Sequence, residues 1–258
     1  MSTLVLASDL HGNRSAYDRL FDLEADAIVL AGDLLPYPLK RGGDLLGLQT
    51  DFVKDYLAPK LASRPCYWIP GNDDWEAALP LLNTQGTPIH GRAVPFLAGF
   101  SIAGYGCVPV TPFGMKDFDR YDVESWDPPQ EPKQCLRSSA AGIEPTTLQE
   151  VKSRGTITAD LARLGELSDP ASTIYVLHSP PFATTLDRLQ GGITPIGSRA
   201  VRTFIEQRRP PLTLHGHVHE SPGVDRLGRT VCVNPGDSMR RLQAVRVDLP
   251  DLKVTPLV

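Results

Sequence analysis

Residues 3–13 read TLVLASDLHGN, an apolar, β-favouring run that stops abruptly at an aspartate and a histidine. An uninterrupted apolar run of this length predicts a strand buried on both faces, and Asn13 is placed to cap a following helix. The arrangement recurs where the apolar runs 27–31 and 66–69 end at Asp33 and Asn72. Alternation of strand, polar turn and helix is typical of an α/β domain with a largely buried sheet.

The same arrangement returns in the second half of the chain. There, predicted strands end at His178 and at the segment Gly216-His217-Val218-His219. A capping box, Thr147-x-x-Glu150, opens a helix that Gly155 interrupts. Apolar runs predict further strands at 93–96, 100–103, 173–177, 212–214, 230–233 and 243–249, and helical spacing predicts helices at 45–61 and 198–207.

Composition narrows the class of protein. With 258 residues, 41% of them hydrophobic, the chain is long enough to bury a core without disulfides. The chain contains no apolar run that approaches the roughly 20 residues of a membrane span. The apolar stretch near its N-terminus, residues 4–7, is too short for a signal peptide and is soon followed by the acidic Asp9. Its four cysteines lack Cys-x-x-Cys spacing, so we expect free thiols and a cytoplasmic protein. A net charge of −4 without a long basic stripe argues against nucleic acid as a partner.

Polar residues concentrate where five predicted strands end. Because the carboxyl ends of strands in open α/β sheets form the ligand site, we expect these side chains to converge. Four of the six histidines, His11, His178, His217 and His219, belong to the motifs at these ends. The candidate ligands that share this placement are Asp9, His11, Asp33, Asn72, His178, His217 and His219.

Each motif taken alone has an ordinary structural explanation. Asp9 could cap a turn, Asp33 could belong to a simple turn, and His178 could be a hydrogen-bonded histidine at a strand end. Gly216-His217-Val218-His219 is more specific, because two imidazoles two residues apart project to the same side of an extended segment. All five motifs in this order favour a metal site.

The ligand types indicate which metals and which chemistry. Imidazole and carboxylate suit Mn, Fe, Zn or Ni, and the lack of thiolate argues against a zinc–cysteine site. Seven ligands exceed the needs of one tetrahedral ion and suit two divalent ions that share a carboxylate. Two ions roughly 3.5–4 Å apart clamp the attacking and leaving oxygens of displacement at phosphorus. Their charge exceeds that of two carboxylates and one hydroxide, so the site should attract phosphate.

These motifs resemble the calcineurin-like metallophosphoesterase superfamily, whose pattern is Asp-x-His, Gly-Asp, Gly-Asn-His-Asp/Glu, a lone His and Gly-His-x-His. The match runs from Asp9 to His219. Asn234-Pro235-Gly236 also resembles a segment common in bacterial and archaeal members. The implied fold class is α/β, a four-layer αββα sandwich of two mixed sheets flanked by helices, as a single domain over residues 1–258.

The resemblance also implies ligand sets and an activity. One metal would be held by Asp9, His11, Asp33 and His219. The other would be held by Asp33, Asn72, His178 and His217, with Asp33 bridging. The expected enzyme is a dinuclear metal-dependent phosphoesterase that attacks small phosphate esters, diesters preferred, with a metal-bridging hydroxide. A phosphomonoesterase and a nucleotide pyrophosphatase are the alternatives within this class.

The chain departs from the family pattern at one position. Asp73 stands where the family commonly has the histidine assigned as proton donor or as stabiliser of the phosphoryl group, between Asn72 and Asp74. We count all three among the candidate catalytic residues. A carboxylate near two cations should be ionised and a poor donor, which would favour substrates with good leaving groups. The alternative is that Asp73 only orients neighbouring groups.

Residues 109–145 are rich in proline, aromatic and charged residues and show no period, so we interpret them as an insertion that acts as a lid. Phe113, Tyr121 or Trp126 could stack on a base or aryl group, and Lys116 or Arg120 could meet a second phosphate. The alternative is that the aromatic residues only pin the insertion to the domain.

Three further residues are candidate substrate contacts by their position in the sequence. Asn13 and Arg14 closely follow the first metal motif, and Arg240 follows the Asn-Pro-Gly segment. Rival hypotheses of another class are a catalytically silent metal-binding scaffold and a phosphate or nucleotide sensor. The sequence leaves the oligomeric state open, a homo-oligomer included.

Overall fold

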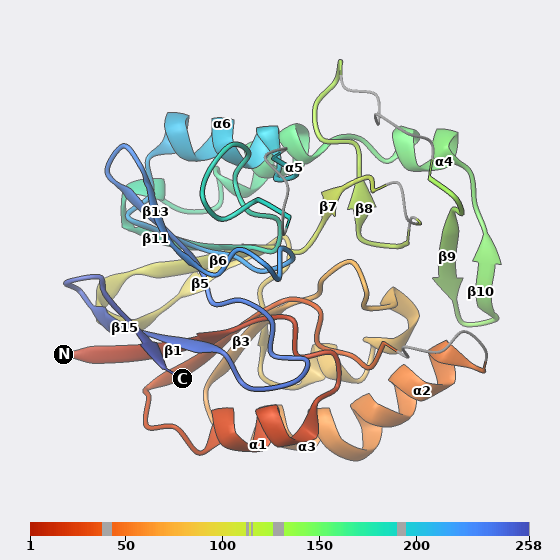
Figure 1. Ribbon diagram of the computed structural model, residues 1–258, viewed down its shortest axis with the longest axis horizontal. Helices are drawn as coiled ribbons and strands as arrows, with labels where there is room; N and C mark the ends of the chain where they lie inside the picture. Colours follow the sequence, from red (N-terminus) through yellow and green to blue (C-terminus); the bar gives the residue numbers. More distant parts are fainter. Residues whose placement is uncertain (38–42, 112–113, 115, 126–131, 190–194, 258) are drawn as a thin grey trace.

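Two stacked six-stranded sheets with helices on both outer faces form a four-layer sandwich, which confirms the predicted fold class (Figure 1). The computed structural model describes residues 1–37, 43–111, 114, 116–125, 132–189 and 195–257.

The first sheet has a parallel centre with antiparallel strands at one side. Its strand order is β16-β15-β1-β2-β3-β4. The strands are β1 (Ser2–Ala7), β2 (Ala27–Ala31), β3 (Cys66–Ile69), β4 (Thr87–Pro88), β15 (Ala244–Leu249) and β16 (Lys253–Leu257).

The second sheet is mixed in the same way, with four parallel strands between antiparallel edges. Its strand order is β13-β14-β12-β11-β6-β5. The strands are β5 (Ala93–Pro95), β6 (Ser101–Tyr105), β11 (Thr173–Leu177), β12 (Leu212–Leu214), β13 (Gly223–Leu227) and β14 (Thr230–Asn234).

Helices cover the outer face of each sheet (Figure 1). The first sheet carries α1 (Arg14–Phe21), α2 (Leu45–Phe52) and α3 (Ala58–Ala62), and the second carries α5 (Ile157–Leu164) and α6 (Arg199–Arg208). The remaining helices are α4 (Leu148–Ser153), the π-turn η1 (Val53–Leu57) and the 3-10 turns η2 (Glu76–Ala78), η3 (Leu82–Thr84), η4 (Leu97–Gly99) and η5 (Pro170–Ser172). No helix among the described residues has both the length and the apolarity to cross a bilayer.

The two hydrophobic layers follow from the two-residue period of a strand. In β1, Leu4 and Leu6 belong to the apolar cluster between the sheets, whereas Val5 and Ala7 belong to the cluster under the helices. Both sets are buried. A strand covered on both faces reads as a continuous apolar run, which is why the sequence predicts the central strands well.

The insertion carries short strands, namely β7 (Val108–Pro109), β8 (Asp119–Arg120), β9 (Leu136–Ser139) and β10 (Gly142–Pro145). Tyr121 is buried and packs in a small cluster with Val110 and Val151. This packing fits the alternative in which the aromatic side chain fastens the insertion to the domain. Phe113 and Trp126 lie outside the described residues.

Some elements differ from the expectation. The predicted helix 45–61 forms as α2 and α3 with the π-turn between them, while the Thr147 capping box and the break at Gly155 are confirmed. The sequence analysis missed the edge strands β13 and β16. Both have exposed residues, and β16 contains Pro256, so neither reads as an apolar run.

Packing between the sheets predicts where the fold is most sensitive. Leu6→Ala should lower the free energy of unfolding by about 2–5 kcal/mol, because it opens a cavity between two sheets that cannot easily close. Leu48→Ala on α2 removes the same atoms from a side chain that is 44% exposed, and it should change stability by less than about 0.5 kcal/mol. Chemical denaturation of both variants measures the difference. Equal losses would contradict this account of the core.

Candidate metal centre

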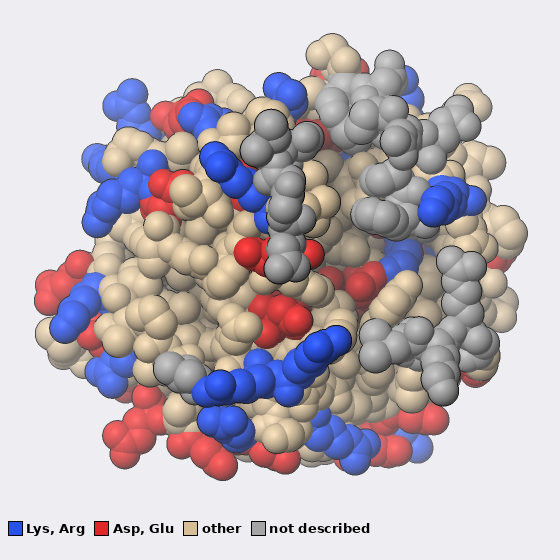
Figure 2. Space-filling model, in the orientation of Figure 1, with Lys and Arg blue, Asp and Glu red and all other residues tan. Residues whose placement is uncertain are grey.

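The polar residues that end five strands come together between the two sheets. From the first sheet, Asp9 follows β1, Asp33 follows β2 and Asn72 follows β3. From the second sheet, His178 follows β11, and the segment that carries His217 and His219 follows β12. In Figure 2, acidic side chains are visible in a hollow near the middle of the molecular face, with Lys or Arg side chains nearby.

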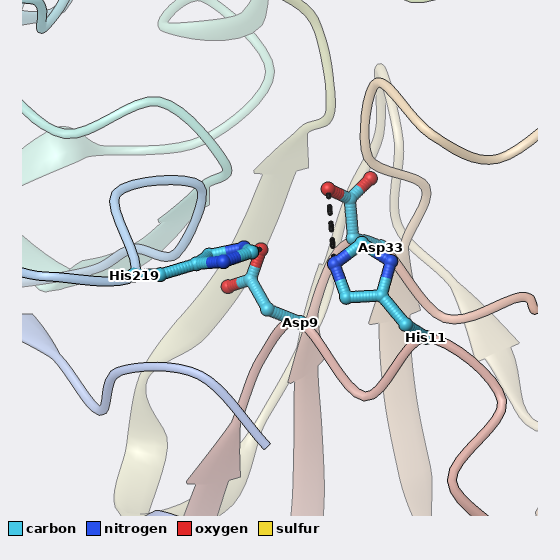
Figure 3. A group of neighbouring side chains, drawn as sticks. All are labelled: Asp9, His11, Asp33 and His219. Carbon is cyan, nitrogen blue, oxygen red and sulfur yellow. Dashed lines mark hydrogen bonds and ion pairs between the residues drawn. The ribbon is translucent and has the colours of Figure 1, made fainter. Parts of the chain in front are cut away.

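A first group consists of Asp9, His11, Asp33 and His219 (Figure 3). Each residue offers one ligand atom, and these four atoms lie within 4.8 Å of one another. The His219 Nε2 atom is 3.2 Å from Asp9 Oδ1, and the His11 Nε2 atom is 3.8 Å from Asp33 Oδ2. These are the four residues that the family resemblance assigns to one metal.

A second group lies on the other side of Asp33. The Nε2 atom of His178 is 3.4 Å from Asp33 Oδ2 and 3.3 Å from Asn72 Oδ1. The rings of His178 and His217 have their centroids 5.3 Å apart. Asp33 therefore contacts a histidine of each group, as a shared carboxylate would.

His11 tests whether the cluster fits a metal. Both ring nitrogens are buried and lack a hydrogen-bond partner among the described residues. Leaving a buried polar atom unpaired costs about 1–3 kcal/mol, so such atoms call for a partner. A cation supplies one, and carboxylate, amide and imidazole donors suit divalent metals of the first transition row. The residues present thus fit a metal ion.

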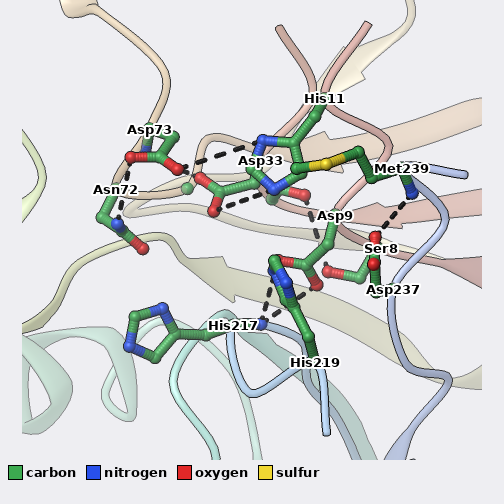
Figure 4. A network of polar contacts seen from close by, with 12 residues as sticks. Ser8, Asp9, His11, Asp33, Asn72, Asp73, His217, His219, Asp237 and Met239 are labelled. Atoms are coloured by element: carbon green, nitrogen blue, oxygen red, sulfur yellow. Dashed lines mark hydrogen bonds and ion pairs between the residues drawn. The ribbon is translucent and has the colours of Figure 1, made fainter. Parts of the chain in front are cut away.

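Backbone strain concentrates at the same residues. Asp9, His11, Asp33 and His217 have positive φ angles of 54°, 43°, 53° and 66°. Non-glycine residues seldom adopt this left-handed conformation, and it persists where surrounding structure enforces it, often at functional sites. These four residues are all candidate ligands, and their side chains gather in one network (Figure 4).

Two glycines allow the loops to approach closely enough. A Cβ atom on Gly71 would lie 2.3 Å from Asp33 Oδ1 and 2.7 Å from His178 Nε2. On Gly216, it would lie 1.8 Å from the Oγ atom of Ser8 and 2.6 Å from Asp9 Oδ2. The glycine in Gly-Asn and in Gly-His-x-His is therefore a steric requirement of the site.

Asp74 holds the loop that carries Asn72. Its carboxylate accepts hydrogen bonds from the backbone N–H groups of Gly71, Leu34 and Leu35 at 2.8 to 3.1 Å. Burial and the nearby Asp33 raise the pKa of Asp74 to about 7. These bonds give Asp74 a positioning role, and the catalytic role expected from the sequence stays a prediction.

Sequence reasoning missed Gln49, a second support of this loop. The side chain is fully buried on α2, donates to the backbone carbonyl of Asp73 at 2.8 Å and accepts from the N–H of Trp75 at 2.8 Å. The sequence does contain a sign of this role, because Gln49 is a polar residue on the apolar face of α2, between Leu45 and Phe52.

The Gly-His-x-His loop has its own supports. His215 is buried, and its ring nitrogens lie 2.9 Å from the carbonyl of Leu177 and 2.8 Å from Thr213 Oγ1, so it is a structural histidine. Asn234 donates to the carbonyl of Val218 at 2.9 Å, which explains why the Asn-Pro-Gly segment accompanies the last motif.

Charges within the centre stabilise one another. Burial opposes ionisation of Asp33, but His178 and His11 hold the pKa of its carboxyl well below the ordinary value. Burial also opposes ionisation of Asp9, but the hydrogen bond to His219 and the charges of His178 and His219 together outweigh burial and lower the pKa. Burial alone would lower the pKa of His178 and His219, yet Asp33 and Asp9 raise both to about 9.

Asp73 reaches the same centre from the loop after β3 (Figure 4). Its backbone N–H donates to Asp33 Oδ1 at 2.7 Å, and its Oδ2 atom is 4.0 Å from His11 Nδ1. The other carboxylate oxygen, Oδ1, forms an ion pair with Lys116 of the insertion. Asp73 therefore links the centre to the insertion.

The three candidate substrate contacts have different surroundings. Asn13 caps α1 by accepting from the Ala16 N–H, and its amide donates to the carbonyls of Ser238 and Met239, so the fold uses this side chain in full. Asn13 thus has a structural role, and its contact with substrate stays a prediction. The guanidinium carbon of Arg14 lies 4.9 Å from the centroid of the Tyr56 ring, in the helical layer. Arg240 is exposed and stays a prediction.

Comparison with known proteins agrees with this geometry. A family model described as calcineurin-like phosphoesterase matches residues 2–221. An uncharacterised protein of Methanocaldococcus jannaschii is 25% identical over 236 residues, which cover 90% of this chain and 87% of that protein. The crystal structure of TT1561 of Thermus thermophilus is similar, with a TM-score of 0.59, 20% identity and 99% and 98% of the two chains covered. A dimetal phosphatase from Danio rerio gives a TM-score of 0.57 at 14% identity, with 96% and 92% covered.

The raised pKa values predict how pH governs metal binding. With pKa values of about 9, His178 and His219 are protonated at pH 7 in the metal-free protein, whereas His217, whose pKa burial lowers to about 4, is neutral. Metal ligation requires neutral imidazole, so binding at pH 7 should release roughly two protons, and affinity should rise from pH 7 to 9 and then level off.

Calorimetric titration of Mn²⁺ in two buffers of different ionisation enthalpy measures the protons released. His219→Asn should reduce the release by about one proton. Heats that do not depend on the buffer would show that these imidazoles are already neutral.

Proposed function

This chain belongs to the calcineurin-like phosphoesterase family, and on that premise we propose that it is a metal-dependent hydrolase of small phosphate esters with a preference for diesters. The observation that carries the proposal is the sharing of one buried carboxylate, Asp33, between two groups of potential ligands. Two divalent ions bound there would activate water and neutralise the charge of a phosphate ester.

The candidate ligands divide between the two ions, and backbone hydrogen bonds orient their carboxylates. In this proposal, Asp9, His11 and His219 belong to one ion, and Asn72, His178 and His217 belong to the other. The backbone N–H of His217 donates to Asp9 at 3.0 Å, and that of Asp73 donates to Asp33 at 2.7 Å. These bonds fix the directions of both carboxylates before a substrate arrives, which is the pre-organisation that electrostatic catalysis requires.

The preference for diesters rests on Asp73. Its carboxylate is ion-paired with Lys116, and in this proposal it does not protonate the departing oxygen. Unaided departure favours esters with intrinsically good leaving groups, such as aryl or nucleotidyl diesters. Phosphomonoesterase and nucleotide pyrophosphatase activity are the alternatives that the assay below separates from this proposal.

The function is tested with metal-stripped protein supplied with Mn²⁺, Ni²⁺ or Zn²⁺ and assayed on matched aryl phosphate mono- and diesters. We expect metal-dependent turnover with diesters hydrolysed faster. Asp33→Asn should lose more than about a hundredfold in kcat/KM, because it removes the shared ligand. Asp18→Asn, at an exposed position on α1, is the control and should retain activity. Tight phosphate binding without turnover under any metal would instead favour the sensor or scaffold hypotheses.

The leaving-group hypothesis has a separate test. Across a series of aryl diesters, log kcat/KM should fall steeply as the pKa of the leaving phenol rises. Asp73→His should flatten this dependence, because an imidazole can supply the proton. A flat dependence in the unaltered protein would overturn the hypothesis, whichever metal is bound.

A further inference from the structure

We propose that Lys116 of the insertion is a substrate-contacting residue, whose ammonium group binds an anionic oxygen of the phosphate ester at the metal centre. The inference rests on the proposed function and deepens it, because it assigns a cation outside the ligand set to the recognition of substrate. It also gives the insertion a specific part in the site.

The position of Lys116 follows from its contact with Asp73. The ammonium pairs with Asp73 Oδ1, while the backbone N–H of the same aspartate bonds to Asp33 at 2.7 Å and its Oδ2 atom is 4.0 Å from His11. A single carboxylate therefore separates the ammonium from two members of the metal centre. An anion held at the centre would lie within the field of this charge.

Lys116 is also held more firmly than a surface lysine. Its side chain is only 14% exposed, its ammonium lies 4.6 Å from the centroid of the Tyr37 ring, and its backbone N–H donates to Asp119 at 2.9 Å. Fixing a lysine in advance removes most of the entropy that it would lose on binding. Among the described residues, Asp73 is its one hydrogen-bonding carboxylate, and an ammonium has three donors.

Charge explains why the lysine is needed beside Asp73. An aspartate at this position adds a negative charge next to the carboxylates of Asp9 and Asp33, which would repel a phosphate. The ammonium of Lys116 cancels that charge. The rival explanation is that Lys116 only cancels the charge of Asp73 and does not contact the substrate. The two explanations predict different effects on phosphate binding.

The test measures binding of inorganic phosphate to the Mn²⁺-loaded full chain by calorimetry, so it does not depend on turnover. Lys116→Gln should weaken binding about 10- to 100-fold, as expected for loss of a charge-assisted hydrogen bond. Lys116→Arg should keep most of the affinity. Metal content is measured for every variant, so that loss of metal is not mistaken for loss of the contact.

Lys60→Gln is the matched control. Lys60 also pairs with an aspartate, Asp18, and its ammonium lies 5.7 Å from the Tyr56 ring centroid, but this pair belongs to the outer helical layer. The substitution should leave phosphate affinity unchanged. If Lys116→Gln with full metal content also binds phosphate as tightly as the unaltered protein, the proposal is overturned.

Repeating Lys116→Gln in an Asp73→Asn background separates contact from cancellation. A direct contact predicts that the lysine substitution still costs about tenfold or more in affinity when Asp73 carries no charge. Cancellation predicts no cost in that background, and this result would refute the contact. Because the readout is binding, absence of hydrolysis in the unaltered protein would refute the proposed function and leave this inference standing on its own measurement.

Discussion

Two carboxylates, those of Asp9 and Asp33, are buried where adjacent parallel strands end, with 1% and 2% of their surface exposed. A buried charge must be compensated by hydrogen bonds and opposite charges, or the fold loses several kcal/mol. The compensating groups come from other loops: the His217 N–H and the His219 ring for one, the Asp73 N–H and the His178 ring for the other. Neutralising two carboxylates therefore fixes loops of both sheets in one arrangement.

How much could be predicted from the sequence depends on how completely each residue is buried. The central strands are covered on both faces, so β2, β3, β11 and β12 are predicted with their observed bounds. The edge strands β13 and β16 mix exposed and half-buried residues and carry no such signal. The ligand candidates could be located because they follow those central strands. The structural role of Asn13 could not be predicted because its partners, Ser238 and Met239, are more than 200 residues away in sequence.

The histidines show where sequence reasoning ends. His215 and His217 stand two residues apart at the end of the same strand, and nothing in their spacing separates them. The structure does, because carbonyls and a hydroxyl surround the ring of His215, whereas His217 lies beside His178. Carbonyls only accept, so Nδ1 of His215 carries the proton, and its Nε2 accepts from the Thr213 hydroxyl, which leaves the ring no lone pair for a metal. For His215, the hydrogen bonds and not the motif assign the role.

The insertion and the metal centre are joined at the segment that follows β3. Asp117 accepts from the N–H of Glu76, and Ser138 accepts from the N–H of Ala77, so two parts of the insertion dock four and five residues after Asn72. Lys116 immediately precedes Asp117, and this docking carries its ammonium to Asp73. Asp73 lies in this segment, and the docking places Lys116 against it, so the two opposite charges are held together. In our proposal, the insertion thereby supplies the positive charge that offsets Asp73 beside an anionic substrate.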